Sequence, residues 1–166
     1  MLAVMVHDSP DFLCIQTRSP LVCRDIKLLQ QLGTNVRVSM TIETDREDIR
    51  KYFTPYAPPI QARLQALQQL AAVGIPIQVA IAPVLPSSEG FAKRLRPLVN
   101  RVCIDDYFMG DGSGGKRTGR MDIQALYRKL GMEEWYDPRA YQSVYKQMRQ
   151  YFSEEELFIS QQGFEP

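Results

Sequence analysis

Four apolar runs rich in β-branched residues recur along the chain, and each is followed by a stretch with helical spacing. The runs are FLCIQT (12–17), VRVSMTI (36–42), IPIQVAIAPVL (75–85) and RVCIDDYF (101–108). Neighbouring parallel strands need a long crossover connection, usually a helix, whereas antiparallel strands do not. The alternation therefore predicts an α/β fold built on a parallel sheet or a partial (β/α) barrel.

The expected helices are strongest after the first two runs. CRDIKLLQQLG (23–33) and PPIQARLQALQQLAAVG (58–74) both carry apolar residues at helical spacing and stop at a glycine. EGFAKRLRPLVN (89–100) has the same spacing but contains Pro97, which would bend the helix. Residues 1–119 are therefore expected to form the partial barrel.

Beyond Gly119 the pattern changes to successive helices, so residues 120–166 are expected to form a C-terminal helical extension packed on the same domain. One stripe in 137–152 has helical spacing and is interpreted as core packing. Its members are Tyr141, Val144, Tyr145, Met148 and Phe152. The final LFISQQGFEP (157–166) is expected to be a short strand or an extended tail.

Composition narrows the class of protein. With 166 residues, 45% of them hydrophobic, the chain is long enough for one core and one domain. The formal net charge of +1 gives no electrostatic basis for unselective nucleic-acid or membrane binding. Nothing near the N-terminus resembles a signal peptide and no stretch has the length of a membrane span, so a cytoplasmic protein is expected. Cys14, Cys23 and Cys103 are too scattered for a disulfide framework or a metal site.

The glycine-rich loop GDGSGGKRTG (110–119) resembles a phosphate-binding P-loop in its first seven positions. Arg117 stands where that motif needs a hydroxyl for magnesium, and Gly119 interrupts the helix that should begin there. A solvated loop and a loop that touches a ligand, such as an anion held by backbone amides, both stay open.

Ligands of parallel βα folds bind at the C-terminal ends of the strands. Arg18, in the sequence Thr17-Arg18-Ser19, ends an otherwise apolar run, so its guanidinium needs an anionic partner: a bound carboxylate, or a neighbouring Asp or Glu. The second run places Ser39, Thr41 and Glu43 on one alternating face. His7 is the only histidine, so no nucleophile–histidine arrangement is available. Asp105 and Asp106 are adjacent in a strand, which disfavours an acid–base couple.

The order CIQTRSPLVCRDIKLLQQLG, VRVSMTIETD and APPIQARLQALQQLAAVGIPIQVAIAPVLP resembles the second half of a radical S-adenosylmethionine domain of the spore photoproduct lyase branch. The resemblance implies about the last four strands of a (β/α)₆ barrel. That family binds a [4Fe–4S] cluster through a Cys-x₃-Cys-x₂-Cys triplet, which this sequence lacks. The cluster is therefore expected only in a longer form, and the chain is expected to be a fragment or else a remnant that cannot perform the family's chemistry alone.

The resemblance also implies roles for individual residues. Arg18 and Ser39 correspond to positions that approach the carboxylate of S-adenosylmethionine, with Thr17 beside them. Ala82, Pro83 and Asp105 would flank the adenosyl group. The family's chemistry is reductive cleavage of S-adenosylmethionine to a 5′-deoxyadenosyl radical, which abstracts hydrogen from a substrate.

Two other functions stay open from the residues. One is a non-catalytic interaction module that binds a partner through the open edge of an incomplete barrel. The other is an anion-binding or nucleotide-binding domain that uses the loop 110–119.

Overall fold

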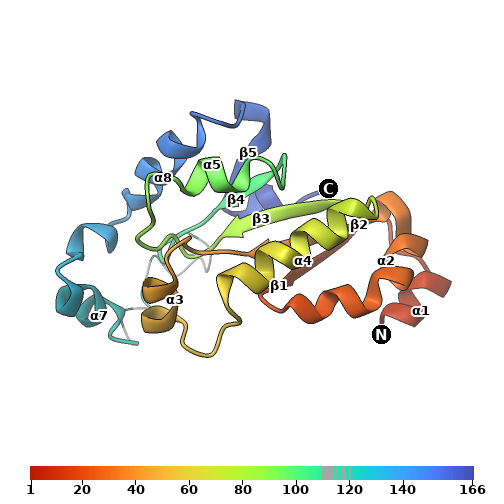
Figure 1. The fold of residues 1–166 in the computed structure, drawn as a ribbon, viewed down its shortest axis with the longest axis horizontal. Helices are drawn as coiled ribbons and strands as arrows, with labels where there is room; N and C mark the ends of the chain where they lie inside the picture. Colours follow the sequence, from red (N-terminus) through yellow and green to blue (C-terminus); the bar gives the residue numbers. More distant parts are fainter. Residues whose placement is uncertain (110–113, 115, 117–118, 120) are drawn as a thin grey trace.

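The computed structural model describes residues 1–109, 114, 116, 119 and 121–166. Most of the glycine-rich loop 110–119 thus lies outside the described residues, and the two interpretations of that loop stay predictions. The described residues form one sheet (Figure 1). Its strands are β1 (Leu13–Thr17), β2 (Val36–Thr41), β3 (Ile77–Ile81), β4 (Val102–Ile104) and β5 (Leu157–Ile159).

All the strand pairs are parallel, and the strands lie side by side in the order β1-β2-β3-β4-β5. This arrangement confirms the α/β fold and the partial parallel barrel expected from the alternating pattern. The first four strands fall in the four predicted runs. The fifth, LFI (157–159), begins the segment 157–166, for which a short strand or an extended tail was expected, and it pairs with β4.

Helices connect the strands. The α-helices are α1 (Leu2–His7), α2 (Ile26–Leu32), α3 (Glu47–Phe53), α4 (Ile60–Ala72), α5 (Phe91–Leu95), α7 (Ile123–Leu130) and α8 (Ala140–Met148). The 3₁₀ turns are η1 (Pro20–Asp25), η2 (Gly33–Asn35), η3 (Glu133–Trp135), η4 (Glu154–Glu156) and η5 (Ser160–Phe164). No helix in the described part of the chain is long and apolar enough to cross a membrane.

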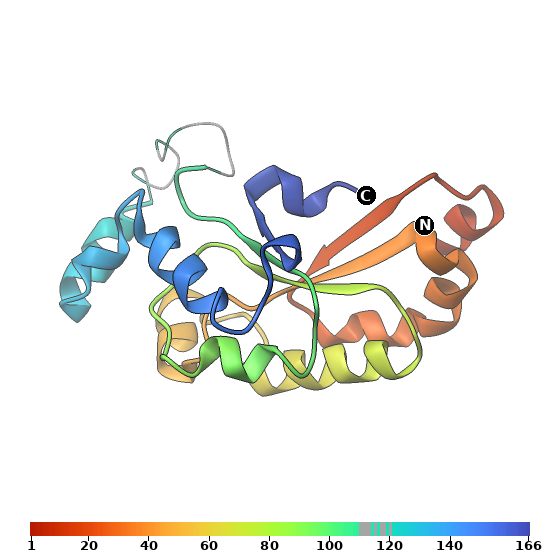
Figure 2. The same ribbon diagram turned by 90° about the horizontal axis from the view of Figure 1, so that it is seen from above.

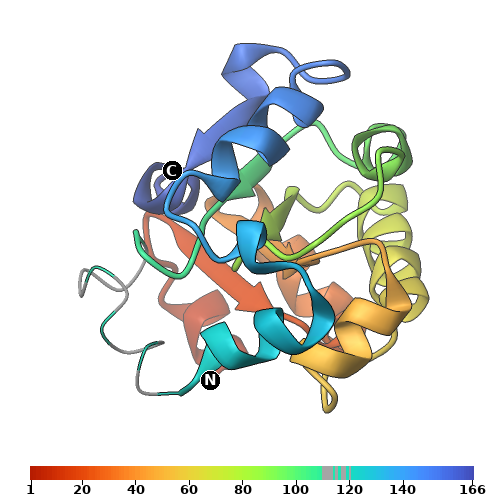
Figure 3. The ribbon, with the colours of Figure 1, turned by 90° about the vertical axis from the view of Figure 1, so that its left-hand side faces the viewer.

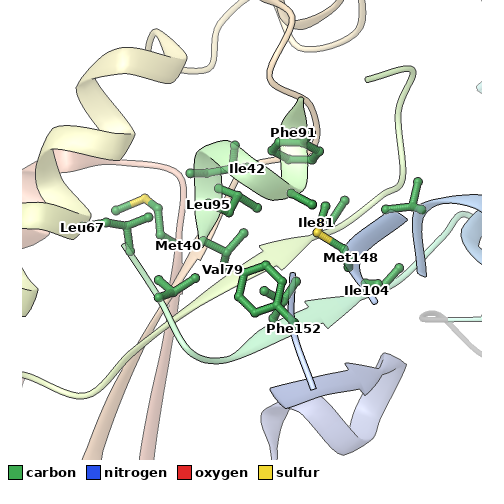
Figure 4. Close-up of a cluster of buried hydrophobic side chains, with 14 of the residues drawn as sticks. Met40, Ile42, Leu67, Val79, Ile81, Phe91, Leu95, Ile104, Met148 and Phe152 are labelled. Atoms are coloured by element: carbon green, nitrogen blue, oxygen red, sulfur yellow. The ribbon is translucent and has the colours of Figure 1, made fainter. Parts of the chain in front are cut away.

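The main core lies between the sheet and the helices that cover one of its faces. Figure 2 shows α2, α4 and α5 on this side, here called the outer face. Alternate strand residues such as Met40 and Val79 point into it and are fully buried. Figure 4 shows them with Leu67 of α4 and Leu95 of α5. The aromatic stripe of α8 packs into the same cluster, which confirms its interpretation as core.

The opposite, inner face of the sheet is polar at the start of the strands. Gln78 donates from Nε2 to Ser39 Oγ (2.9 Å), and Arg101 donates from Nε to Gln78 Oε1 (3.0 Å). Arg37 donates to the Glu165 carbonyl oxygen (2.7 Å). The C-terminal turn η5 therefore covers this end of the inner face, and Figure 2 shows it on the side away from α4.

The packing of η5 against β4 requires a glycine. A Cβ atom at Gly163 would lie 2.3 Å from the sulfur of Cys103, closer than atoms can approach. Burial of Cys103 raises the pKa of its thiol to about 12, so at neutral pH it stays protonated and acts as a small apolar side chain.

Candidate functional site at the ends of the strands

All five strands point toward the same end of the sheet, here called the mouth, where α3 and α7 lie in front of them (Figure 3). The fold brings the residues that follow each strand together at this end. They come from segments far apart in the sequence, around residues 18, 43, 82 and 105.

Arg18 follows β1 directly and turns its guanidinium across the mouth. Its Nε donates to Glu43 Oε1 (2.5 Å), and its Nη2 donates to the Ala82 carbonyl oxygen (3.2 Å). Its side chain remains 44% exposed. None of the described residues accepts a hydrogen bond from Nη1. Arg18 is therefore an anchored cation with one nitrogen still available to a ligand.

Glu43 explains how Arg18 is anchored. Its carboxylate is fully buried, and its second oxygen accepts from Arg63 Nη1 (2.8 Å). The same Nη1 donates to the Thr41 carbonyl oxygen (2.7 Å). Arg63, on α4, is itself fully buried, while its Nε and Nη2 have no hydrogen-bond partner among the described residues. Two guanidinium groups thus share one carboxylate, and these three side chains together carry a charge of +1.

Arg63 was not predicted as a site residue, although the sequence holds a signal for it. Ile60, Leu64 and Leu67 form the buried face of α4, and position 63 has the spacing of that same face. A charged residue there must be paired inside the protein, because it cannot reach solvent.

Ser39 lies on the inner face of the sheet, as Arg18 does, but deeper. The β1–β2 register pairs Gln16 with Ser39 and Thr17 with Met40, so Arg18 is level with Thr41. Ser39 is thus two residues, about 7 Å, below Arg18. Its hydroxyl is fully buried and bonded to Gln78. The two side chains share a face. Ser39, however, lies nearer the start of the strands, and its hydroxyl does not reach the mouth in this structure.

The other predicted residues occupy the rim of the mouth in different ways. Thr17 Oγ1 accepts from the Ser19 amide (2.9 Å) and so shapes the turn after β1. Ala82 gives its carbonyl oxygen to Arg18, and the Ala82–Pro83 peptide bond is cis. Asp105 Oδ1 accepts from the Asp106 amide (2.9 Å). Among the residues predicted to bind the cofactor, Arg18 and Ala82 are joined by a hydrogen bond.

Three tyrosines that were not predicted as site residues pack together in the segments after β4 and in and after α7. Tyr107, Tyr127 and Tyr136 have ring centroids 5.7–6.4 Å apart. Burial is the main cause of the raised pKa of Tyr107. The carboxylate of Glu43 raises that pKa further, and Arg18 opposes the change. The phenol of Tyr107 therefore stays protonated at neutral pH and lies within electrostatic range of the Arg18–Glu43 pair.

A hollow of about 510 Å³ opens next to Arg18. Its walls are the turn after β1, Phe53 at the end of α3, and the loop that follows with Tyr56 and Pro58. Tyr56 is fully exposed. Arg18 thus borders a space of the size that small ligands occupy.

The described residues contain no group of three or more Cys, His, Asp or Glu side chains that could hold a metal ion. Cys14, Cys23 and Cys103 are free thiols on different parts of the sheet and its connections. A [4Fe–4S] cluster therefore does not fit the donors that this part of the chain offers.

No family model matches the sequence. Two curated relatives are similar to part of it. An uncharacterized protein of Acidianus two-tailed virus is 37% identical over 75 residues, which are 45% of this chain and 25% of that protein. An uncharacterized protein of Methanocaldococcus jannaschii is 32% identical over 74 residues, 45% of this chain and 28% of that protein. The match thus spans only about a quarter of the length of either relative.

Solved structures of spore photoproduct lyase are similar in fold. A mutant of that enzyme superposes with a TM-score of 0.54 at 17% identity, over 89% of this chain and 50% of that chain. A mutant with bound S-adenosylmethionine and dinucleoside spore photoproduct gives a TM-score of 0.51, with the same identity and coverage. The likeness establishes the fold, and this chain spans half the length of those structures.

Proposed function

We propose that this chain forms the part of a radical S-adenosylmethionine enzyme that binds the carboxylate of S-adenosylmethionine. The reaction class is the reductive cleavage of that molecule to a 5′-deoxyadenosyl radical, followed by hydrogen abstraction from a substrate. The fold likeness to spore photoproduct lyase, one of whose structures contains S-adenosylmethionine, supports the proposal. Because the described residues offer no cluster ligands, we assign them ligand binding and no step of electron transfer.

The observation that carries the proposal is the anchored cation at the mouth. Arg18 is fixed by Glu43 and Ala82, yet it keeps Nη1 available beside a hollow. A guanidinium in this position suits a carboxylate, which accepts charge-assisted hydrogen bonds. Pro83 and Asp105 follow β3 and β4 at the same mouth, where an adenosyl group would extend from Arg18.

Calorimetric titration with a matched pair of ligands tests this role. Decarboxylated S-adenosylmethionine lacks only the group that Arg18 is proposed to bind. The chain is expected to bind S-adenosylmethionine about tenfold or more tightly than the decarboxylated form, because a hydrogen bond to a charged group contributes about 1.5–3 kcal/mol. Equal affinities for the two ligands would contradict the proposal.

The longer form that supplies a cluster can be sought in the gene. The proposal expects an in-frame Cys-x₃-Cys-x₂-Cys motif about two βα units before Met1, or in a separate chain that associates with this one.

The second candidate function is an interaction module, and the open edge of β1 favours it. In the described part of the chain β1 pairs only with β2. Beside this edge Met1, Val4 and Leu21 are large apolar side chains with 92%, 68% and 55% of their surface exposed. The partner that fits is a further parallel strand with its own helix, which would pair with β1 and cover these side chains.

Sedimentation velocity tests the interaction module. If the edge is paired by another chain, the purified protein is expected to sediment above its monomer mass of 19.0 kDa or to gain mass with a co-expressed partner. Leu21→Lys is expected to reduce that association, because the ammonium group would be desolvated in the interface. A monomer at every concentration, alone and with the co-expressed chain, would count against this function.

A further inference from the structure

Arg18, the residue proposed to touch the ligand, is joined through Glu43 to Arg63. Arg18 comes from the end of β1, Glu43 from the segment after β2, and Arg63 from α4. The last two are fully buried, so neither can contact a molecule in the mouth. Their effect on a ligand must pass through Arg18.

Glu43 restricts the orientation of the Arg18 side chain. A half-exposed arginine on a strand end would normally sample several rotamers, and fixing them on binding reduces affinity. Here Nε is held by the carboxylate and Nη2 by a carbonyl oxygen, which leaves Nη1 pointing away from both. The guanidinium is thus oriented before any ligand arrives.

Arg63 fixes the orientation of Glu43 in turn. Its Nη1 bridges the second carboxylate oxygen and the Thr41 carbonyl at the end of β2, which ties Glu43 to the sheet. The hydrogen-bonding capacity of Arg63 is only partly used in this position, since no described residue bonds its buried Nε and Nη2. Apolar side chains often stabilise such sites as well as buried ion pairs do, so stability alone does not account for the arrangement.

We propose that Glu43 and Arg63 are positioning residues, which orient Arg18 and leave a net positive charge for an incoming carboxylate. This inference rests on the proposed function. Arg18, Glu43 and Arg63 together carry a charge of +1, so a bound ligand carboxylate would bring the total charge of the four groups to zero. Neither positioning residue touches the ligand.

A double-mutant cycle tests the inference with S-adenosylmethionine and its decarboxylated form as probes. Glu43→Gln keeps the size of the side chain and removes its charge. It raises the charge of the three side chains from +1 to +2, yet the loss of the fixed Arg18 orientation is expected to dominate and to weaken S-adenosylmethionine binding about tenfold, with no comparable loss for the decarboxylated form. In an Arg18→Ala background the same change is expected to have no further effect, because Glu43 acts only through Arg18. Equal losses for both ligands, or additive losses in the double variant, would overturn the positioning role.

A ligand-free readout separates this inference from the proposed function. In ¹⁵N NMR the Arg18 Nε–H, assigned by its loss in Arg18→Lys, is expected to be a sharp, slowly exchanging signal that broadens in Glu43→Gln. Arg63→Lys, which keeps the charge next to Glu43, is expected to broaden the Arg18 Nε–H signal less than Glu43→Gln does. If Glu43→Gln does not fold, Arg63→Lys takes its place in the experiment. If wild-type protein binds neither probe, the proposed function fails. An Arg18 signal unchanged in the variants overturns the positioning role on its own.

Discussion

Replacement of Arg63 by methionine is expected to lower the free energy of unfolding by about 3–5 kcal/mol, the usual effect of removing one partner from a buried ion pair. Glu43 would keep only Arg18, which is 44% exposed, and one carboxylate oxygen would be buried without a donor. The loss would be measured by urea unfolding monitored by circular dichroism.

The matched controls distinguish the buried ion pair from a general effect of losing an arginine. Arg46→Met removes an arginine from the exposed pair with Asp48 and is expected to change stability by less than about 1 kcal/mol. Arg63→Met combined with Glu43→Met removes both buried charges and is expected to recover much of the loss, because apolar side chains can replace such a pair. A single Arg63→Met variant as stable as wild type would show that the pair is not buried as described.

Replacement of Arg18 by alanine is expected to weaken S-adenosylmethionine binding by about 1.5–3 kcal/mol, roughly 10–150-fold, the contribution of a hydrogen bond to a charged group. Decarboxylated S-adenosylmethionine should bind both proteins equally, because the removed guanidinium contacts only the carboxylate. Isothermal titration calorimetry with the two ligands would measure the difference.

Arg24→Ala is a suitable control for this variant. Arg24 is exposed on η1, six residues further along the chain, and donates only to the Leu21 carbonyl oxygen (3.4 Å). The same charge is thus removed beside β1 without touching the proposed carboxylate site. An Arg18→Ala protein with unchanged affinity for S-adenosylmethionine would remove Arg18 from the site.

The sheet could be predicted from the sequence because its strands are buried on the outer face and therefore read as apolar runs. β1 to β4 begin and end within the predicted runs. α3 (Glu47–Phe53) was not predicted, since its buried residues are Ile49 and an arginine, which leave no apolar stripe. β5 is short and joins the sheet through its pairing with β4, a contact with a distant segment that no local pattern encodes.

The candidate site was predictable only in part. The charge at the end of β1 identified Arg18, and both a ligand carboxylate and a nearby acidic side chain were open as its partner. The structure shows the ion pair with Glu43 and leaves the ligand as a proposal. Ser39 is on the expected face, but the register of the strands and its bond to Gln78 place it below the mouth. These relationships depend on pairing across strands, which a single sequence does not specify.

The strands follow one another in the sheet in the same order as in the sequence, so the sheet can form strand by strand during synthesis. Of the five described strands, β5 is the last to leave the ribosome, and it occupies the edge of β4 together with the turn that covers Cys103. Until residues 157–164 emerge, the nascent chain can pair β1 to β4 but must expose the backbone of β4 to other chains. Pairing of β5 with β4 therefore covers this edge only after the other four strands have been made.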